Sequence, residues 1–293
     1  MVDARFKKSF EKGERQRASG DHEGAFAFYQ DCLGFVDKSV APRAYAVAAF
    51  RLVRMSRVLE RDSFARELLS ELADDDVLPS EIRLESFEIL IRLLMDFSSG
   101  AELFEAAERA LALAGATEAH AVKARIHGNL GVLALRDTDW NGARHNFLLS
   151  AEGFGAVDDI EGQAEAWTAL GEVAAKTGGL DEAFRFFEDA FRALVDHQSF
   201  ARASVPRAAM GHILRRRGQS REALRIFEEV CAVNGRQGNQ VSGTFVDLAA
   251  ARMDLGDWVS AEGALNLARK NASNAVERAK VSYLQADWLV EMG

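Results

Sequence analysis

One short signature recurs along this chain, and successive copies lie 38 or 40 residues apart. Its clearest copy reads Trp167-x-x-Leu170-Gly171, followed by Ala183 and Phe187. A fixed period of this length indicates an array of structural repeats, in which each unit packs only on its neighbours. The slot that Gly171 occupies is filled along the chain by Gly13, Val53, Ile91, Gly131, Gly171, Gly211 and Ala249.

Each repeat contains two apolar stripes whose residues recur three, four and seven positions apart, the pattern of amphipathic helices. Antiparallel helices approach closely only where a side chain is nearly absent, so we expect the small slots at helix contacts and the bulky slots between hairpins. In the third repeat Ile91 and Ala107 exchange the usual sizes, which predicts local repacking. The bulky slot of the second stripe holds Tyr29, Leu69, Ala107, Phe147, Phe187, Phe227 and Leu265.

The segments between stripes carry residues that end one helix and start the next. Gly20, Gly178, Gly218 and Gly256 suit the left-handed conformation that closes a helix. We expect the three prolines at or near the starts of first helices, where an amide has no helical partner. They are Pro42, Pro79 and Pro206. Sustained alternation of β-branched residues is absent from the sequence, so we expect about fifteen helices in antiparallel pairs and no strands.

The signature resembles that of tetratricopeptide-repeat proteins, through Trp167-x-x-Leu170-Gly171, Gly178, Ala183 and Phe187. That family usually repeats at a shorter period. The longer period here, with Asn129-Leu130-Gly131, is similar to the branch found in spindle-orientation scaffolds, kinesin light chains and the sensor arrays of bacterial transcription regulators. The resemblance covers the whole chain, with the third repeat the most divergent.

The resemblance implies an all-α, right-handed superhelix, an α-solenoid of about seven helix-turn-helix repeats plus a C-terminal helix. We expect one domain over residues 1–293, and the sequence is also compatible with the N-terminal part of a longer protein. The predicted repeats span 3–38, 42–75, 79–115, 119–157, 160–198, 201–237 and 239–274, and the terminal helix spans 276–292.

The predicted terminal helix has Tyr283, Ala286 and Leu289 on one face. Two interpretations are open for it. It is either a capping helix that closes the array, or a surface that packs on a further part of a longer protein. A cap is expected to be polar on its outer side, so this apolar face favours the second interpretation.

The bulk composition excludes several classes of protein. A net charge of −9 and a pI near 5.3 argue against a nucleic-acid-binding chain, which would carry a clustered basic face. The two cysteines, Cys32 and Cys231, form no metal-binding pair, and we interpret them as reduced helix residues. With no apolar signal segment after Met1 and no long uncharged stretch, we expect a cytoplasmic protein without a membrane span. The composition favours a bacterial source.

Motifs for catalysis, cofactors and metals are absent from the sequence. There is no phosphate-binding glycine loop, no His-Glu-x-x-His and no Gly-x-Ser-x-Gly. Asp74, Asp75 and Asp76 could hold a hard cation, but they lack the glycine and the distal glutamate of a calcium loop. We interpret them as an acidic loop between repeats. The sequence therefore predicts a protein that is not an enzyme and binds no cofactor or metal.

The resemblance implies that ligands contact the first helices, which line the concave side of such an array. Arginine pairs carboxylates in two-point fashion, so the basic residues predict an acidic peptide or a C-terminal carboxylate as partner. Asn129 matches the asparagine that contacts a peptide backbone in the resembled family. The alternative is a solvated face balanced by Glu60, Glu67, Glu85 and Glu88. The candidate residues are Arg51, Arg54, Arg57, Arg92, Asn129, Arg136, His212 and Arg215.

Three functions remain compatible with these residues. The leading hypothesis is a protein-protein interaction module that binds a partner's peptide or helix in its groove, in bacterial signalling or assembly. The first alternative is the sensor domain of a larger signalling or transcription protein, binding a small molecule or a signal peptide. The second is a structural scaffold that forms homo-oligomers through the exposed ends of the array.

Overall fold

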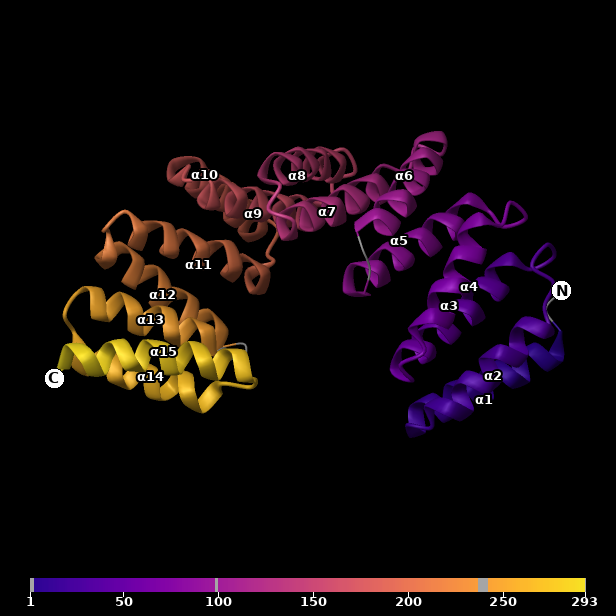
Figure 1. Cartoon of the computed structure of the whole chain (residues 1–293), viewed down its shortest axis with the longest axis horizontal. Helices are drawn as coiled ribbons and strands as arrows, with labels where there is room; N and C mark the ends of the chain where they lie inside the picture. The colour runs from indigo at the N-terminus through magenta and orange to yellow at the C-terminus, as the bar shows by residue number, and fades with distance from the viewer. Residues whose placement is uncertain (1–2, 98–99, 237–241, 293) are drawn as a thin grey trace. The chain divides into compact units, whose positions relative to one another are not determined.

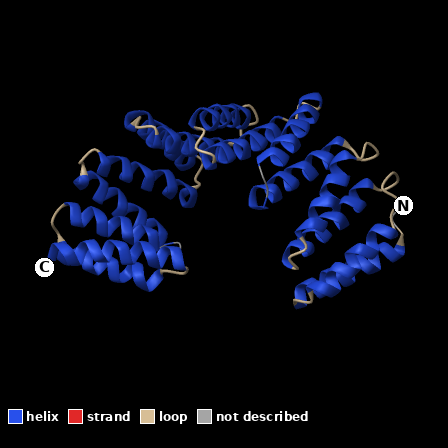
Figure 2. Cartoon of the chain, in the orientation of Figure 1, coloured by secondary structure: helices blue, strands red, loops and turns tan. Residues whose placement is uncertain are grey.

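The computed structural model describes residues 3–97, 100–236 and 242–292, and over these residues it contains fifteen α-helices and no strand (Figure 2). Most helices that are neighbours in the chain pack against one another (Figure 1). The predicted all-α repeat fold is therefore confirmed.

Odd-numbered helices are the first members of the repeats and even-numbered helices are the second members. The first helices are α1 (Ala4–Ser19), α3 (Pro42–Val58), α5 (Ser80–Phe97), α7 (His120–Arg136), α9 (Ile160–Lys176), α11 (Phe200–Arg216), α13 (Ser242–Asp254) and α15 (Ala275–Met292). The second helices are α2 (His22–Gly34), α4 (Asp62–Asp74), α6 (Gly100–Ala116), α8 (Trp140–Gly155), α10 (Leu180–Asp196), α12 (Ser220–Arg236) and α14 (Trp258–Asn271).

The helices form two compact units, Met1–Leu133 and Ala134–Gly293. The first unit has one large core that runs from Ala25 to Leu133, and a smaller cluster contains Phe6, Cys32 and Ala48. In the second unit the largest core joins α9 to α14, and smaller clusters lie beneath Trp140 and Trp167. That the whole chain acts as one domain stays a prediction.

A small residue facing a large one holds the two helices of a hairpin together. A Cβ atom added to Gly171 would lie 2.6 Å from the ring of Phe187, and one added to Gly211 would lie 2.7 Å from the ring of Phe227. Each ring thus occupies the space where the side chain of the first helix would otherwise project. The bulky residue packs on the glycine of its own hairpin, and not only between hairpins as the sequence indicated.

The third repeat reverses this arrangement. Ile91 on α5 and Ala107 on α6 are both completely buried, so the large side chain comes from the first helix and the small one from the second. The second repeat lies between these extremes, with Val53 and Leu69 buried in the same slots. The side chains of the two slots fill the same space between the helices, and repeats differ in which slot holds the larger side chain.

The turns within hairpins contain one residue in the left-handed conformation. Gly20, Gly178, Gly218 and Gly256 have φ values of 83°, 90°, 76° and 75°, as the sequence predicted. Thr138 adopts the same conformation at φ 59° despite its branched side chain. This geometry favours glycine because it has no Cβ to clash with the following carbonyl.

Aspartate begins several helices, and a glycine three residues later makes room for it. Asp139 accepts a hydrogen bond from the Gly142 amide at 3.0 Å, and a Cβ on Gly142 would lie 2.1 Å from the same carboxylate. Asp159 accepts the same kind of hydrogen bond from the Gly162 amide, at 2.9 Å. The spacing Asp-x-x-Gly is therefore a local signal for a helix start.

The prediction for the prolines is correct for two of them and wrong for the third. Pro42 is the first residue of α3, and Pro79 directly precedes α5. Pro206 lies inside α11 and is buried, in the middle of the helix and not at its start. A proline there removes one backbone hydrogen bond, and its ring fills core space between α11 and its neighbours.

The Gly171 contact generates a stability prediction. Gly171→Ala should lower the free energy of unfolding by about 1–3 kcal/mol, because the added methyl group overpacks the contact with Phe187. Chemical denaturation followed by circular dichroism measures the change.

Two further variants make this result specific. Gly263 is an exposed helical glycine with nothing near its missing Cβ, so Gly263→Ala should raise stability by about 0.5–1 kcal/mol. Adding Phe187→Leu to Gly171→Ala reproduces the Ala249–Leu265 combination of the last complete repeat and should recover part of the loss. Equal effects of the two glycine substitutions would contradict the steric explanation.

Candidate peptide-binding surface

The eight predicted binding residues are divided between the two units. Arg51, Arg54 and Arg57 lie on α3, Arg92 on α5 and Asn129 on α7, all in the first unit. The second unit holds the remaining three: Arg136 at the end of α7, and His212 and Arg215 on α11.

Two of these arginines form the same ion pair in different repeats. Arg57 Nη2 lies 2.7 Å from Asp96 Oδ2 on the next first helix. Arg215 makes the equivalent contact with Asp254, at 2.7 Å through Nε and 3.0 Å through Nη2. Both pairs join residues 39 positions apart. These two arginines therefore connect successive first helices.

Arg51 belongs to a network around Glu14 that the sequence interpretation missed. Arg51 Nε lies 3.0 Å from Glu14 Oε1, the Tyr29 hydroxyl donates to the same oxygen at 2.8 Å, and Arg17 donates to Oε2 at 2.8 Å. Burial acts to raise the pKa of Glu14, but hydrogen bonds from Arg17 and Tyr29 and the charge of Arg51 leave it lowered. Burial and the Glu14 contact raise the pKa of Tyr29 to about 12.

His212 and Arg136 also have acidic neighbours. His212 Nε2 lies 3.4 Å from Asp247 Oδ2 on α13, and its ring packs on Phe227 with 5.3 Å between ring centres. Arg136 Nε lies 3.8 Å from Asp137 Oδ1. Both side chains are thus engaged within the second unit.

Three predicted residues remain available in the first unit. Arg54 and Arg92 are exposed, and Asn129 is partly exposed. Within the described residues, the side chains of these three make no hydrogen bond or ion pair. Arg54 and Arg92 each follow the Val53/Ile91 slot, so they occupy the same position in consecutive repeats.

Ion pairs between first helices place these three side chains in one row. The Arg57–Asp96 pair joins α3 to α5, and Arg54 and Arg92 each lie one helical turn before their member of that pair. Arg125 Nη2 lies 2.7 Å from Glu88 Oε1 and joins α7 to α5. Asn129 and Arg92 each follow that pair by one turn. We call Arg54, Arg92 and Asn129 the first-helix row.

The four glutamates that could balance these arginines, Glu60, Glu67, Glu85 and Glu88, do not pair with the first-helix row. Glu88 is paired with Arg125. The pKa of Glu85 on α5 is raised, first by partial burial of its carboxyl group and then by the charge of Glu88. Glu60 and Glu67 form no ion pair within the described part of the chain. Within the described residues, the two arginines of the row therefore have no carboxylate partner.

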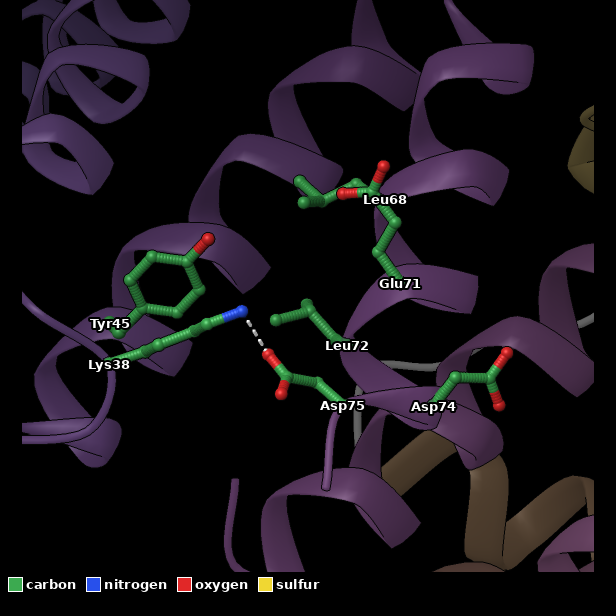
Figure 3. Close-up of a pocket in the computed structure, with 7 residues that line it drawn as sticks. All are labelled: Lys38, Tyr45, Leu68, Glu71, Leu72, Asp74 and Asp75. Atoms are coloured by element: carbon green, nitrogen blue, oxygen red, sulfur yellow. Dashed lines mark hydrogen bonds and ion pairs between the residues drawn. The ribbon is translucent and has the colours of Figure 1, made fainter. Parts of the chain in front are cut away.

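A recess of about 320 Å³ lies between the loop after α2 and helices α3 and α4 (Figure 3). Its lining includes Lys38, Tyr45, Glu71 and Asp75, and the Lys38 ammonium points to the Asp75 carboxylate, with which it forms an ion pair (Figure 3). This hydrogen bond is the largest cause of the lowered pKa of Asp75. No sequence motif indicated this contact, because its partners lie 37 positions apart.

The three consecutive aspartates each pair with a different cation. Asp74 pairs with Arg109, Asp75 with Lys38, and Asp76 with Arg83 at 2.6 Å. Each carboxylate thus ties the loop to a different element of the first unit. This arrangement agrees with an acidic loop between repeats and provides no shared centre for a cation.

The two cysteines are poor nucleophiles in this environment. Burial is the main reason that the pKa values of Cys32 and Cys231 are raised to about 11. At neutral pH both side chains are thiols, whereas reaction and metal binding require the thiolate.

Comparison with known proteins identifies the fold. The sequence matches no protein-family model and no curated protein sequence. The structure aligns with a signal-transduction ATPase with numerous domains from Pyrococcus horikoshii that has a tetratricopeptide-repeat sensor, at TM-score 0.74 and 12% identity over 96% of this chain. This chain spans 44% of that protein's length.

Two further solved structures give the same result. The apo form of RapI aligns at TM-score 0.71 and 11% identity, over 97% of this chain and 82% of RapI. Aspartyl phosphate phosphatase F from Bacillus subtilis aligns at TM-score 0.63 and 13% identity, over 94% of this chain and 71% of the other. The chain thus has the helical-repeat fold of tetratricopeptide-repeat proteins, and these identities establish the fold alone.

Among the helices that the structure describes, none combines the length and apolar character that crossing a bilayer requires.

The Lys38–Asp75 pair generates a pH prediction. Because the pKa of Asp75 is lowered in the folded protein, its contribution to stability is present above the ordinary aspartate value and is lost as the pH falls below about 4. NMR titration of the Asp75 carboxyl carbon should show a pKa below the ordinary range, and Lys38→Met should raise it while keeping the apolar stem. An unchanged Asp75 pKa in Lys38→Met would show that the ion pair does not form.

Proposed function

We propose that this chain is a non-enzymatic interaction module that binds a peptide or helix of a partner protein along the first helices of its first unit. The observation that carries this proposal is the first-helix row. Its two arginines are exposed at equivalent positions of adjacent first helices, and neither is paired within the part of the chain that the structure describes. Most other candidate residues on these helices are held by acidic neighbours.

The chemistry of the row favours an acidic ligand. A guanidinium group donates two parallel hydrogen bonds to a carboxylate, and such charge-assisted bonds are about twice as strong as neutral ones. Arg54 and Arg92 can therefore hold two carboxylates, or one side chain and a free C-terminal carboxylate. The Asn129 amide can both donate to and accept from the backbone of an extended peptide.

The surroundings of the row reduce the cost of binding. Arg57–Asp96 and Glu88–Arg125 hold the three first helices in register at 2.7 Å each. The side chains of the row are thus presented from fixed helices, and a ligand orders only their outer atoms. The proposed setting is a bacterial cytoplasmic signalling or assembly complex.

Replacing both arginines should remove binding without unfolding the chain. The probe is a short fluorescent peptide rich in Asp and Glu that ends in a free carboxylate, and anisotropy measures its affinity. Arg54→Glu with Arg92→Glu should weaken binding by about 100-fold or more, since each lost charged hydrogen bond is worth about 1.5–3 kcal/mol. The same peptide with Gln and Asn in place of the acidic residues should bind weakly to the unaltered chain.

A matched control distinguishes binding to the first-helix row from a general effect of the change in net charge. Arg185 on α10 and Arg225 on α12 are exposed and form no ion pair within the described residues. Arg185→Glu with Arg225→Glu makes the same change in net charge and should leave the affinity within a few-fold. Equal losses in the two double variants, or no binding of the acidic peptide by the unaltered chain, would contradict the proposal.

A second candidate is the sensor domain of a larger signalling protein. It is favoured by the alignment of 96% of this chain with a protein described as having a tetratricopeptide-repeat sensor. A sensor changes its shape when its ligand binds, so the radius of gyration from small-angle X-ray scattering should shift when the acidic peptide is added. An unchanged radius at saturating peptide would favour the simple interaction module.

A further inference from the structure

Helix α15 exposes a continuous apolar seam that the rest of the fold does not use. α15 lies beside α13 and α14 (Figure 1). The exposed seam consists of Val276, Ala279, Tyr283, Ala286 and Val290. The three large members are 65%, 72% and 79% exposed. A surface of this kind on a well-anchored helix indicates a docking face.

The opposite side of α15 fixes the helix to the second unit. Val281 is buried, and Leu284 and Trp288 pack on the core. The Trp288 indole donates a hydrogen bond to the Trp258 carbonyl at 3.0 Å. The orientation of the seam is therefore set by the fold.

The start of α15 is fixed as well. The Asn274 side chain accepts from the Glu277 amide at 3.0 Å, and the Glu277 carboxylate accepts from the Ser273 amide at 2.7 Å. This reciprocal cap uses the charge of Glu277 within its own helix.

The seam has the spacing of a coiled coil. Its members follow one another after three and four residues in alternation, so Val276, Tyr283 and Val290 occupy one heptad position and Ala279 and Ala286 the other. Large residues thus alternate with alanines along one line. The hairpins of this protein use the same complementarity, with a large side chain opposite a small one.

Two charged residues beside the seam favour pairing with a second α15 helix in the antiparallel orientation. Lys280 and Asp287 follow the two alanines, are exposed, and form no ion pair within the described residues. They lie seven residues apart, about two helical turns, which is too far for them to pair along the helix. In an antiparallel pair of α15 helices, Lys280 faces the partner's Asp287, and by symmetry Asp287 faces the partner's Lys280.

We propose that α15 pairs with α15 of a second copy of this chain in an antiparallel, two-fold symmetric dimer. In the register set by the charges, Tyr283 packs on the partner's Ala286 and Val290 packs on the partner's Ala279. The four layers formed by Ala279, Tyr283, Ala286 and Val290 then each combine a large residue with a small one. Shifting one helix by a heptad places Lys280 against the partner's Lys280, so repulsion excludes that register.

The size of the seam determines how strong the proposed dimer is expected to be. A pair of single helices buries less than the roughly 800 Å² per partner of a stable complex. The dimer should therefore be weak and concentration-dependent, with a micromolar dissociation constant. It leaves the first-helix row in the first unit free for a ligand.

Sedimentation velocity of the full chain, from low micromolar to submillimolar concentration at low salt, tests the proposal. The unaltered chain should pass from monomer to dimer. Lys280→Asp alone and Asp287→Lys alone should each weaken dimerisation by about tenfold or more, because two attractive pairs become repulsive. The double variant Lys280→Asp with Asp287→Lys should restore it, and an equimolar mixture of the two single variants should form a heterodimer.

Two substitutions serve as controls. Tyr283→Asp should abolish dimerisation, whereas Val40→Glu, at an exposed apolar residue outside α15, should have no effect. Circular dichroism must show unchanged helix content in each variant. A chain that stays monomeric at the highest concentration, a dimer that survives Tyr283→Asp, or a double charge variant that fails to recover would each overturn the proposal.

Discussion

The close contact between a small residue on one helix and a large residue on the next is the constraint on which the array depends. Phe187 lies where any side chain at Gly171 would have to project, and Tyr29 lies over Gly13 in the same way. This contact sets the distance between the two helices of a hairpin. The third repeat meets the same requirement with Ile91 and Ala107, so the larger residue of the contact can come from either helix.

A second regularity follows from the first. Where successive first helices stack in the same way, residues about one repeat apart in the sequence lie side by side. Arg57–Asp96, Arg215–Asp254 and Glu88–Arg125 are pairs of this kind. Single exposed ion pairs contribute little stability, so their main effect is to fix the register of neighbouring helices and to occupy their arginines.

Helix pairing, the glycine turns and the buried slots could be predicted because each depends on a few neighbouring residues. The partners of the arginines could not, since Asp96, Asp254 and Glu14 lie 37 to 39 positions away and a small shift in register would change them. Pro206 was placed wrongly because proline is usual at a helix start, whereas α11 begins at Phe200 and accommodates this proline in its interior. Of the predicted binding residues, Arg54 and Arg92 were distinguished from Arg51 and Arg57 only by the positions of these acids.

The pairing of Arg57 with Asp96 has a consequence for how such a surface can change. The cation is already in place beside Arg54 and Arg92, and it is balanced by Asp96 at 2.7 Å and, more distantly, by Asp62 at 3.8 Å. Loss of the Asp96 carboxylate would strengthen the cationic surface without adding a basic residue and without altering a packing contact. In this architecture, ligand preference can therefore change through the loss of an acidic residue that itself does not contact the ligand.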